Sequence, residues 1–170
     1  MPLKNPDEID IKILFLLQRN ARISLREISK KIHLSFTAVR LRVKRLEDEG
    51  YIKNYVAILS KAKININLMS FTGISLHENC NYNLTSFLEF VKGIPEVCSC
   101  YHVNGMFDFL LYIVAADMQE YHNCLVNTLC KIDSVKEIRT FFVLDESGAD
   151  HMIDLTHLFR RFSAKSPDVN

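Results

Sequence analysis

The order of apolar and polar residues predicts three helices within the first fifty positions of this 170-residue chain. Asn5 precedes Pro6 and stands three residues before Glu8, an order typical of a helix N-cap, a first helical residue and the acid of a capping box. The first helix is therefore expected to begin at Pro6 and to end near Gln18.

Two further capping signals place the next helices. Ser24 and Glu27 form a second capping box before a short apolar stripe, which predicts a helix of about two turns. Ser35 caps a third helix over residues 36–49. Gly50 follows in the position where a left-handed residue ends a helix.

Beyond residue 50 the pattern changes to that of a mixed α+β domain. Residues 51–60 are rich in β-forming side chains and predict a linker strand, followed by a polar segment at 61–67. The remaining signals predict strand 69–76, helix 84–92, strand 97–103, strand 107–115, helix 118–131 and strand 135–144. This βαββαβ order is typical of a ferredoxin-like fold.

The expected architecture is α+β, with an N-terminal winged helix-turn-helix domain joined by a β-strand linker to the ferredoxin-like domain. We divide the chain into a helix-turn-helix domain (1–53), a linker strand and connection (54–67), a ferredoxin-like domain (68–158) and a frayed C-terminal tail (159–170).

Charge separates the two halves of the chain more clearly than its overall composition does. The net charge is only +1, but residues 1–61 carry 13 basic and 7 acidic side chains, and residues 62–170 carry 8 and 13. The longest uncharged apolar run, 109–116, is too short to span a membrane, and no apolar signal core opens the chain. Five cysteines without CxxC spacing favour reduced, buried thiols in the cytoplasm.

The predicted third helix has an apolar stripe opposite a cationic face. Val39, Val43 and Leu46 follow core spacing, and a step of about 100° per residue puts Thr37, Arg40 and Lys44 on the other side. Nine Lys or Arg and a single acid lie between residues 19 and 45. Such clustering is typical of surfaces that neutralise nucleic-acid phosphates.

A short helix, a tight turn and a longer helix with a polar outer face predict a helix-turn-helix whose second helix enters the major groove of double-stranded DNA. The candidate DNA-binding residues are Ser35, Phe36, Thr37, Arg40, Leu41, Arg42, Lys44 and Arg45. The guanidinium group of Arg40 can donate two hydrogen bonds to guanine, and Thr37 offers a hydroxyl and a methyl group. The alternative from spacing alone is a solvated charged face on a small helical bundle.

The segment from Asp7 to Ala57 resembles the N-terminal half of the Lrp/AsnC (leucine-responsive/asparagine-type) transcription regulators. The residues that carry this resemblance are Asp10, Ile13, Leu14, Asn20, Ala21, Arg22, Ile28, Ser35, Val39, Arg42, Val43, Leu46, Gly50 and Ile52. The segments IPEVCSCYHVNGMFDFLLYI and SVKEIRTFFVLDE resemble the effector domain of the same family. The resemblance implies a transcriptional regulator rather than an enzyme.

Three positions depart from the family pattern. His33 stands in the turn where glycine is usual, and histidine is among the few other residues enriched at positive φ. Leu41 replaces a frequent arginine, which favours apolar contact with a thymine methyl group. Met106 stands in the glycine loop where an acid is common.

The ferredoxin-like domain is expected to leave one sheet face bare. Helices cover only one side of a βαββαβ sheet. Strands 97–103 and 107–115 nevertheless carry apolar or thiol side chains that point to both faces of the sheet. Stacking against a second copy would bury this face and pair two DNA-binding domains. The resemblance implies the same homodimer, often assembled into tetramers or octamers, so a palindromic DNA site is expected.

Asn104 and Gly105 predict a tight hairpin whose backbone N–H groups face an incoming carboxylate, and Asp108 lies in position to receive an ammonium group. A plain hairpin with a surface aspartate explains the same residues. The resemblance implies that a small-molecule effector, an amino acid, binds near His102, Gly105, Asp108, Met118, Phe141, Phe142 and Val143. The apolar members suit an aliphatic, aromatic or sulfur-containing side chain, unless Phe141 and Phe142 fill the space themselves.

We expect no metal site, no cofactor and no catalytic centre. Cys98, Cys100 and His102 alternate along one strand, where same-face positions about 6.5 to 7 Å apart are too distant to share a tetrahedral ion. No nucleophile elbow, P-loop or GxGxxG motif occurs. Two alternatives remain open, namely a haem-pathway decarboxylase of similar architecture and an effector-free DNA-architectural protein.

Overall fold

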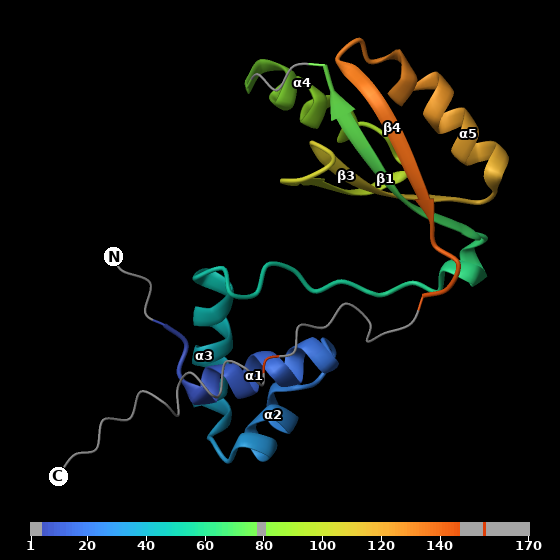
Figure 1. The fold of residues 1–170 in the computed structure, drawn as a ribbon. Coiled ribbons are helices and arrows are strands. Elements are labelled where there is room, and N and C mark those ends of the chain that lie inside the picture. The colour runs from blue at the N-terminus through green and yellow to red at the C-terminus, as the bar shows by residue number, and fades with distance from the viewer. Residues whose placement is uncertain (1–4, 78–80, 147–154, 156–170) are drawn as a thin grey trace. The chain divides into compact units, whose positions relative to one another are not determined.

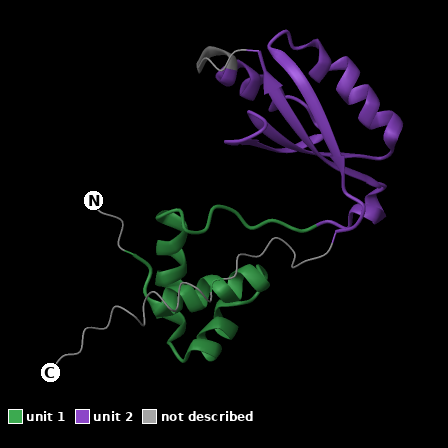
Figure 2. Cartoon of the chain, viewed as in Figure 1, with its two compact units in different colours: residues 1–58, 148–170 green, residues 59–147 purple. Residues whose placement is uncertain are grey.

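The computed structural model describes residues 5–77, 81–146 and 155 of the chain. It divides into two compact units, one formed by residues 1–58 and 148–170 and the other by residues 59–147 (Figure 2). The predicted C-terminal tail at 159–170 lies outside the described residues. No helix of the described part of the chain is long and apolar enough to cross a membrane.

The first unit contains the three predicted helices, α1 (Glu8–Arg19), α2 (Leu25–Ile32) and α3 (Phe36–Asp48) (Figure 1). The N-cap of α1 is Asp7 and not Asn5, so the predicted start was wrong by two residues. Asp7 and Asp10 form the capping box, in which each carboxylate accepts the backbone N–H of the other, at 2.8 and 2.9 Å. A charged oxygen is the stronger acceptor at a helix N-terminus, which explains why this pair prevails.

The turn and cap predictions for α2 and α3 are confirmed. Ser24 and Glu27 form a reciprocal capping box, and His33 adopts the left-handed conformation with φ of 55°. Ser35 caps α3 by accepting the N–H of Ala38. Gly50 follows α3 at φ of 76°, a region that a residue with a Cβ enters only at a cost.

The three helices close a single small core. Its fully or nearly buried members come from all three helices and include the predicted stripe of α3: Ile13, Leu17, Ile28, Val39, Val43 and Leu46. Burial of such side chains contributes about 1.5 to 3 kcal/mol each, which holds α3 against α1 and α2.

The linker differs from its prediction, because residues 53–60 form no strand. A strand requires a hydrogen-bonded neighbour, and none of the described strands pairs with this segment. Val56, Ile58 and Leu59 are instead exposed. The polar segment beyond them contains a short 3₁₀ helix, η1 (Lys61–Ile64), which the sequence did not predict.

The second unit has the predicted βαββαβ order. Its elements are β1 (Leu68–Leu76), α4 (Asn81–Val91), β2 (Val97–His102), β3 (Phe109–Ala115), α5 (Met118–Asn127), η2 (Leu129–Lys131) and β4 (Val135–Phe142). The four strands form one antiparallel sheet in the order β2-β3-β1-β4 (Figure 1). This order places the first and third strands at the centre, as a ferredoxin-like fold requires.

Burial along β3 alternates strictly, because both helices cover the same face of the sheet. Phe109, Leu111 and Ile113 are fully buried and pack in one cluster with side chains of α4 and α5. The residues between them point to the opposite face and are only partly buried. The sheet therefore has one closed face and one open face.

The connection between β2 and β3 is longer than the expected tight hairpin. β2 ends at His102 and β3 begins at Phe109, so residues 103–108 form a six-residue loop instead of an Asn-Gly turn. A hydrogen bond of 3.0 Å from Val103 N–H to the Asp108 carbonyl closes its base. Phe107 does not extend β3, and its ring lies over Gly73 of β1.

Candidate nucleic-acid interface and effector region

The outer face of α3 is exposed as predicted. Thr37, Arg40 and Lys44 are all exposed, and so are the apolar side chains of Phe36 and Leu41. Neither Arg40 nor Lys44 has an ion-pair partner among the described residues. The first turn of α3 carries no acid, so no side chain of that turn would repel a phosphate from the helix N-terminus.

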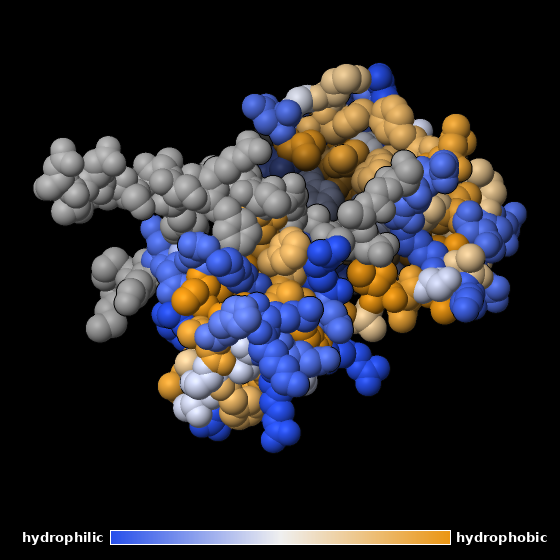
Figure 3. All heavy atoms as spheres, turned by 90° about the horizontal axis from the view of Figure 1, so that it is seen from below, coloured by the Kyte–Doolittle hydropathy of each residue, from blue (hydrophilic) through white to orange (hydrophobic). Residues whose placement is uncertain are grey.

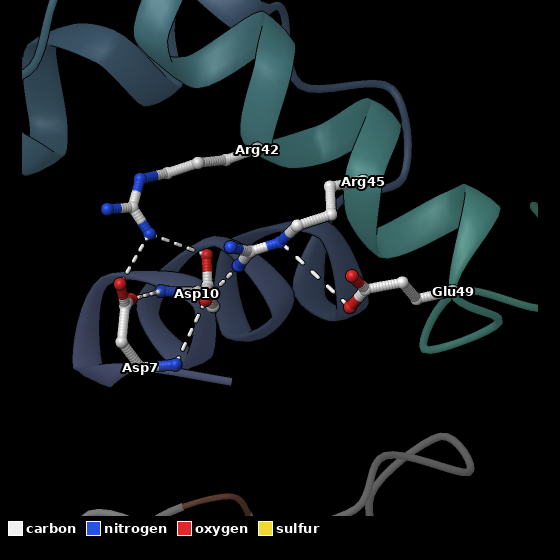
Figure 4. Close-up of polar contacts among 5 residues, drawn as sticks. All are labelled: Asp7, Asp10, Arg42, Arg45 and Glu49. Carbon is white, nitrogen blue, oxygen red and sulfur yellow. Dashed lines mark hydrogen bonds and ion pairs between the residues drawn. The ribbon is translucent and has the colours of Figure 1, made fainter. Parts of the chain in front are cut away.

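Arg42 and Arg45 lie on a different flank of α3 and point toward α1 (Figure 4). Nη1 of Arg42 donates to Asp7 Oδ2 at 2.6 Å and to Asp10 Oδ1 at 2.8 Å. Nη2 of Arg45 donates to Asp10 Oδ2. Both guanidinium groups are thus engaged within the unit, and a direct DNA contact of these two arginines stays a prediction.

Asp10 is the centre of this cluster and is only 1% exposed. A buried carboxylate is tolerated only when charged hydrogen bonds replace its lost hydration, which the two guanidinium groups supply here. Partial burial would raise the pKa of Asp7, but hydrogen bonds from Arg42 and the Asp10 amide outweigh it and hold that pKa below its usual value. The hydrogen bond to Asp7 in turn raises the pKa of Arg42.

Sequence reasoning missed this cluster, although a signal for it exists. Asp7 and Asp10 are three residues apart in one helix, and Arg42 and Arg45 are three residues apart in another. Residues at this spacing share a helix face, so two such pairs of opposite charge indicate two facing flanks.

A shallow groove of about 470 Å³ lies beside the exposed cations Arg40 and Lys44 of α3. It is lined by Leu17, Ala21, Ile23, Leu25, Arg40, Val43, Lys44, Glu47, Asp48 and Tyr55. The Tyr55 hydroxyl donates to Glu47 Oε1 at 2.8 Å and so fastens the start of the linker to α3. Burial, together with the hydrogen bond to Glu47, raises the pKa of Tyr55 to about 12.

The far end of the linker is anchored to the second unit by Lys61. Its ammonium group donates to the Glu146 carboxylate at 2.7 Å and to the Tyr112 hydroxyl at 2.9 Å. The hydrogen bond to Glu146 is the main reason that the pKa of Lys61 is raised. Only residues 56–60 thus lie between the two anchored ends.

The candidate effector residues fall into two groups. His102, Gly105 and Asp108 lie at the end of the sheet where β2 meets β3, whereas Met118 lies at the other end. Phe142 and Val143 lie toward the Met118 end, since Phe142 pairs with Ser70 and Val143 donates to Met69 O, five residues along β1 from Ile74 or roughly 17 Å. Phe141 lies between the two ends, because it pairs with Phe71 and its ring meets that of Phe107.

Asp108 has a structural contact of its own. Its Oδ2 accepts the backbone N–H of Leu76 at 2.7 Å, and its own N–H donates to Ile74 O at 2.9 Å. These bonds tie the loop to β1, and Oδ1 has no hydrogen-bond partner among the described residues. Gly105, at φ of 156°, has nothing within 4 Å of the place where a Cβ would stand.

The open face of the sheet is lined by aromatic side chains. Phe71 packs at a tilted angle against Tyr112 with ring centroids 5.4 Å apart, and Phe107 meets Phe141 edge to face at 6.2 Å. Phe107 lies directly over Gly73, where a Cβ would come within 2.6 Å of its ring. Apolar side chains reach the surface of both units, visible as orange spheres in Figure 3.

The cysteines are less uniformly buried than expected. Cys124 is buried and Cys100 is half-buried, and burial raises the pKa of both thiols. Cys98 and Cys130 are exposed, contrary to the prediction, because Cys98 lies at an irregularity of β2 and Cys130 in η2. Cys80 lies outside the described residues. Among the residues that are described, no three His, Cys, Asp or Glu side chains could hold a metal ion together.

The two units correspond to two known domain families. Residues 6–53 match the winged helix-turn-helix DNA-binding family, and residues 69–151 match the Lrp/AsnC ligand-binding domain. This combination defines a DNA-binding regulator with a ligand-binding domain. The chain belongs to the Lrp/AsnC family of transcriptional regulators.

Individual relatives agree with this assignment. A leucine-responsive regulatory protein of Haemophilus influenzae is 39% identical over 140 residues, which are 82% of this chain and 84% of the relative. The Bkd operon transcriptional regulator of Pseudomonas aeruginosa is 36% identical over 138 residues, 81% of this chain and 90% of the relative. A Neisseria meningitidis transcriptional regulator solved as an L-Met complex superposes with a TM-score of 0.85 at 33% identity and covers 91% and 99% of the two chains.

Proposed function

We propose that this regulator reads a specific DNA sequence with the exposed face of α3. The observation that carries the proposal is the exposure of Arg40 and Lys44 on one side of α3, where neither has an ion-pair partner in the described part of the chain. Arg40 is the base-reading residue, because its guanidinium group can fork onto guanine. Lys44 is the phosphate-binding residue, and the remaining members of the interface are Ser35, Phe36, Thr37 and Leu41.

Selection of genomic fragments by the purified protein, followed by binding to the selected operator, tests this proposal. Arg40→Ala should cost about 1 to 3 kcal/mol on the operator and relax the preference at one base position. Lys44→Ala should lower the affinity for all duplexes alike. The slope of log affinity against log salt should become shallower by about one unit, the contribution of one phosphate contact. Equal losses for the two variants on random DNA would contradict these roles.

We also propose that the second unit is the assembly surface. A second copy would cover the aromatic open face of the sheet, since large exposed apolar surfaces normally mark contacts. The resulting two-fold pair would present two copies of α3 to a palindromic operator. Assembly of such dimers into tetramers or octamers follows the family pattern, and sedimentation of the purified protein tests it.

The proposed effector is an amino acid, as the L-Met complex of the relative suggests. In a single protomer Phe141 lies beside Phe107, but Met118 and Val143 lie toward the opposite end of the sheet from Asp108, too far for one small molecule to contact all of them. A site between copies, to which one copy contributes the Asp108 end and another the Phe142 end, removes this difficulty. The second copy is therefore part of the proposed site.

Calorimetric titration with individual L-amino acids, methionine first, tests this site. Asp108→Asn is the informative variant, because an amide oxygen still accepts the N–H of Leu76 but no longer attracts an ammonium group. We expect loss of amino-acid binding with unchanged operator affinity. If no amino acid alters DNA binding by the native protein, the chain fits the effector-free architectural alternative instead.

An enzyme of the haem-pathway decarboxylase type is the weaker alternative. The relatives that this chain matches are named as regulators. The exposed cations of α3 would also have no function in porphyrin chemistry. Operator binding that depends on Arg40 would remove this alternative.

A further inference from the structure

The four cations on α3 occur in two different environments. Arg40 and Lys44 face outward without ion-pair partners in the described chain, whereas Arg42 and Arg45 share the carboxylate of Asp10 (Figure 4). We infer that Asp10 withholds these two arginines from the DNA phosphates and thereby sets how well the protein discriminates its operator from other DNA. This inference rests on the proposed docking of α3.

The burial of Asp10 makes the arrangement difficult to open. Its side chain is 1% exposed, so water cannot replace a departing guanidinium group. Without the arginines, the buried carboxylate would keep only the backbone N–H of Asp7, at 2.9 Å. An unpaired buried charge is strongly unfavourable, so the protein retains both ion pairs when DNA approaches.

The arginines are near enough to the surface to matter if they are released. The side chains of Arg42 and Arg45 are 28% and 32% exposed, on the same helix as the DNA-facing cations. Each cation that reaches a phosphate strengthens binding to every duplex, whatever its sequence. Two additional phosphate contacts would therefore favour the vast excess of non-specific sites.

The same ion pairs also align α3 with α1. Arg42 and Arg45 lie one turn apart, so their bonds to one carboxylate fix the rotation of α3 as well as its distance from α1. Base readout depends on side chains held in a narrow geometry. Loss of the Asp10 charge should thus weaken operator recognition and strengthen non-specific binding together.

Asp10→Asn in the full-length protein tests the inference. This variant keeps an oxygen for the amide of Asp7 but loses the buried charge that binds both guanidinium groups, so that Arg42 keeps only its ion pair with the half-exposed Asp7. On a random duplex, we expect its plot of log affinity against log salt to steepen by about one to two units. The ratio of operator affinity to random-duplex affinity should fall at the same time.

Glu8→Gln is the matched control, because it removes the same charge two residues earlier from a solvent-exposed pair with Lys12. Its salt dependence should remain close to that of the native protein. Equal steepening in both variants would mean that net charge alone is responsible, and it would overturn the inference.

A second experiment does not depend on whether the Asp10 variant folds. In the native background, Arg42→Gln and Arg45→Gln should leave the salt dependence on random DNA unchanged, whereas Lys44→Gln should reduce it by about one unit. A reduction by either arginine variant equal to that of Lys44→Gln would overturn the inference while the proposed function stands. Absence of DNA binding by the native protein would instead overturn the proposed function, and the inference with it.

Discussion

The two units of this chain differ in which side chains they bury and which they expose. The helical unit buries charge: a carboxylate that is 1% exposed holds two arginines between α1 and α3. The sheet unit exposes apolar surface: Phe71 and Phe141 on its open face are 40% and 53% exposed. The first unit thus pairs its buried charge internally, and the second leaves aromatic side chains exposed to solvent.

This difference agrees with what each unit is proposed to contact. A surface that approaches DNA must present a defined number of cations, and internal ion pairs limit that number. A surface that binds a copy of itself gains from aromatic side chains, which contribute large contact areas. The helical unit therefore buries ion pairs, whereas the sheet unit exposes aromatic side chains.

The largest effect is expected from a charge introduced on the open face of the sheet. Phe141→Asp should abolish the proposed dimer, because it removes an aromatic contact and would bury an unpaired carboxylate. We expect the dissociation constant to rise at least about 100-fold, equivalent to about 3 kcal/mol, as measured by analytical ultracentrifugation. Phe90→Asp is the control, since Phe90 is similarly exposed but lies on α4, on the covered side of the sheet. If both variants remain dimeric, the open face is not the interface.

Gly73→Ala tests whether the open face is already packed before a partner arrives. The added Cβ would stand 2.6 Å from the Phe107 ring, which must move. We expect a loss of about 1 to 3 kcal/mol in the free energy of unfolding, measured by urea denaturation. Phe107→Ala removes the obstacle, so Gly73→Ala should cost much less in that background. Additive losses in the double variant would show that the two positions are independent.

The elements of the fold were predictable because local signals and packing agree in most of them. The capping pair Ser24 and Glu27, the left-handed His33 and the stripe of α3 each follow from spacing that the structure retains. The same is true of the βαββαβ order. In each case a few neighbouring residues contain the information, and no distant contact overrides it.

The remaining features depend on contacts that no local pattern contains. The linker looks like a strand because its residues favour one, but a strand needs a neighbour that this chain does not provide among its described strands. Arg42 and Arg45 look like DNA-binding cations because only the folded structure brings Asp10 to them across 32 and 35 residues. The two-ended distribution of the effector residues likewise emerges only from the strand order.

A smaller effect is expected where the helical unit meets the linker. Tyr55→Phe removes the hydroxyl that donates to Glu47 and should lower the free energy of unfolding at neutral pH by about 0.5 to 1.5 kcal/mol. The raised pKa means that the folded state holds the phenolic proton more tightly. The difference between the native protein and the variant should therefore be constant below pH 10 and decline as the pH rises toward 12. A difference that persists unchanged in alkaline denaturation experiments would argue against this contact.

The smallest effect concerns Asp7, which tests whether the charge cluster stabilises the helical unit by itself. Its pKa is lowered in the folded protein from 3.8, so its contribution is complete above that value and is lost as the pH falls below it. Asp7→Asn retains a helix cap but not the charge, and should cost less than about 1 kcal/mol at neutral pH because half of the Asp7 side chain is exposed. Urea denaturation from neutral pH down to pH 3 should show the difference narrowing in the acid range. In an Arg42→Gln background most of this pH dependence should disappear, and its full persistence there would assign it to the capping bond instead.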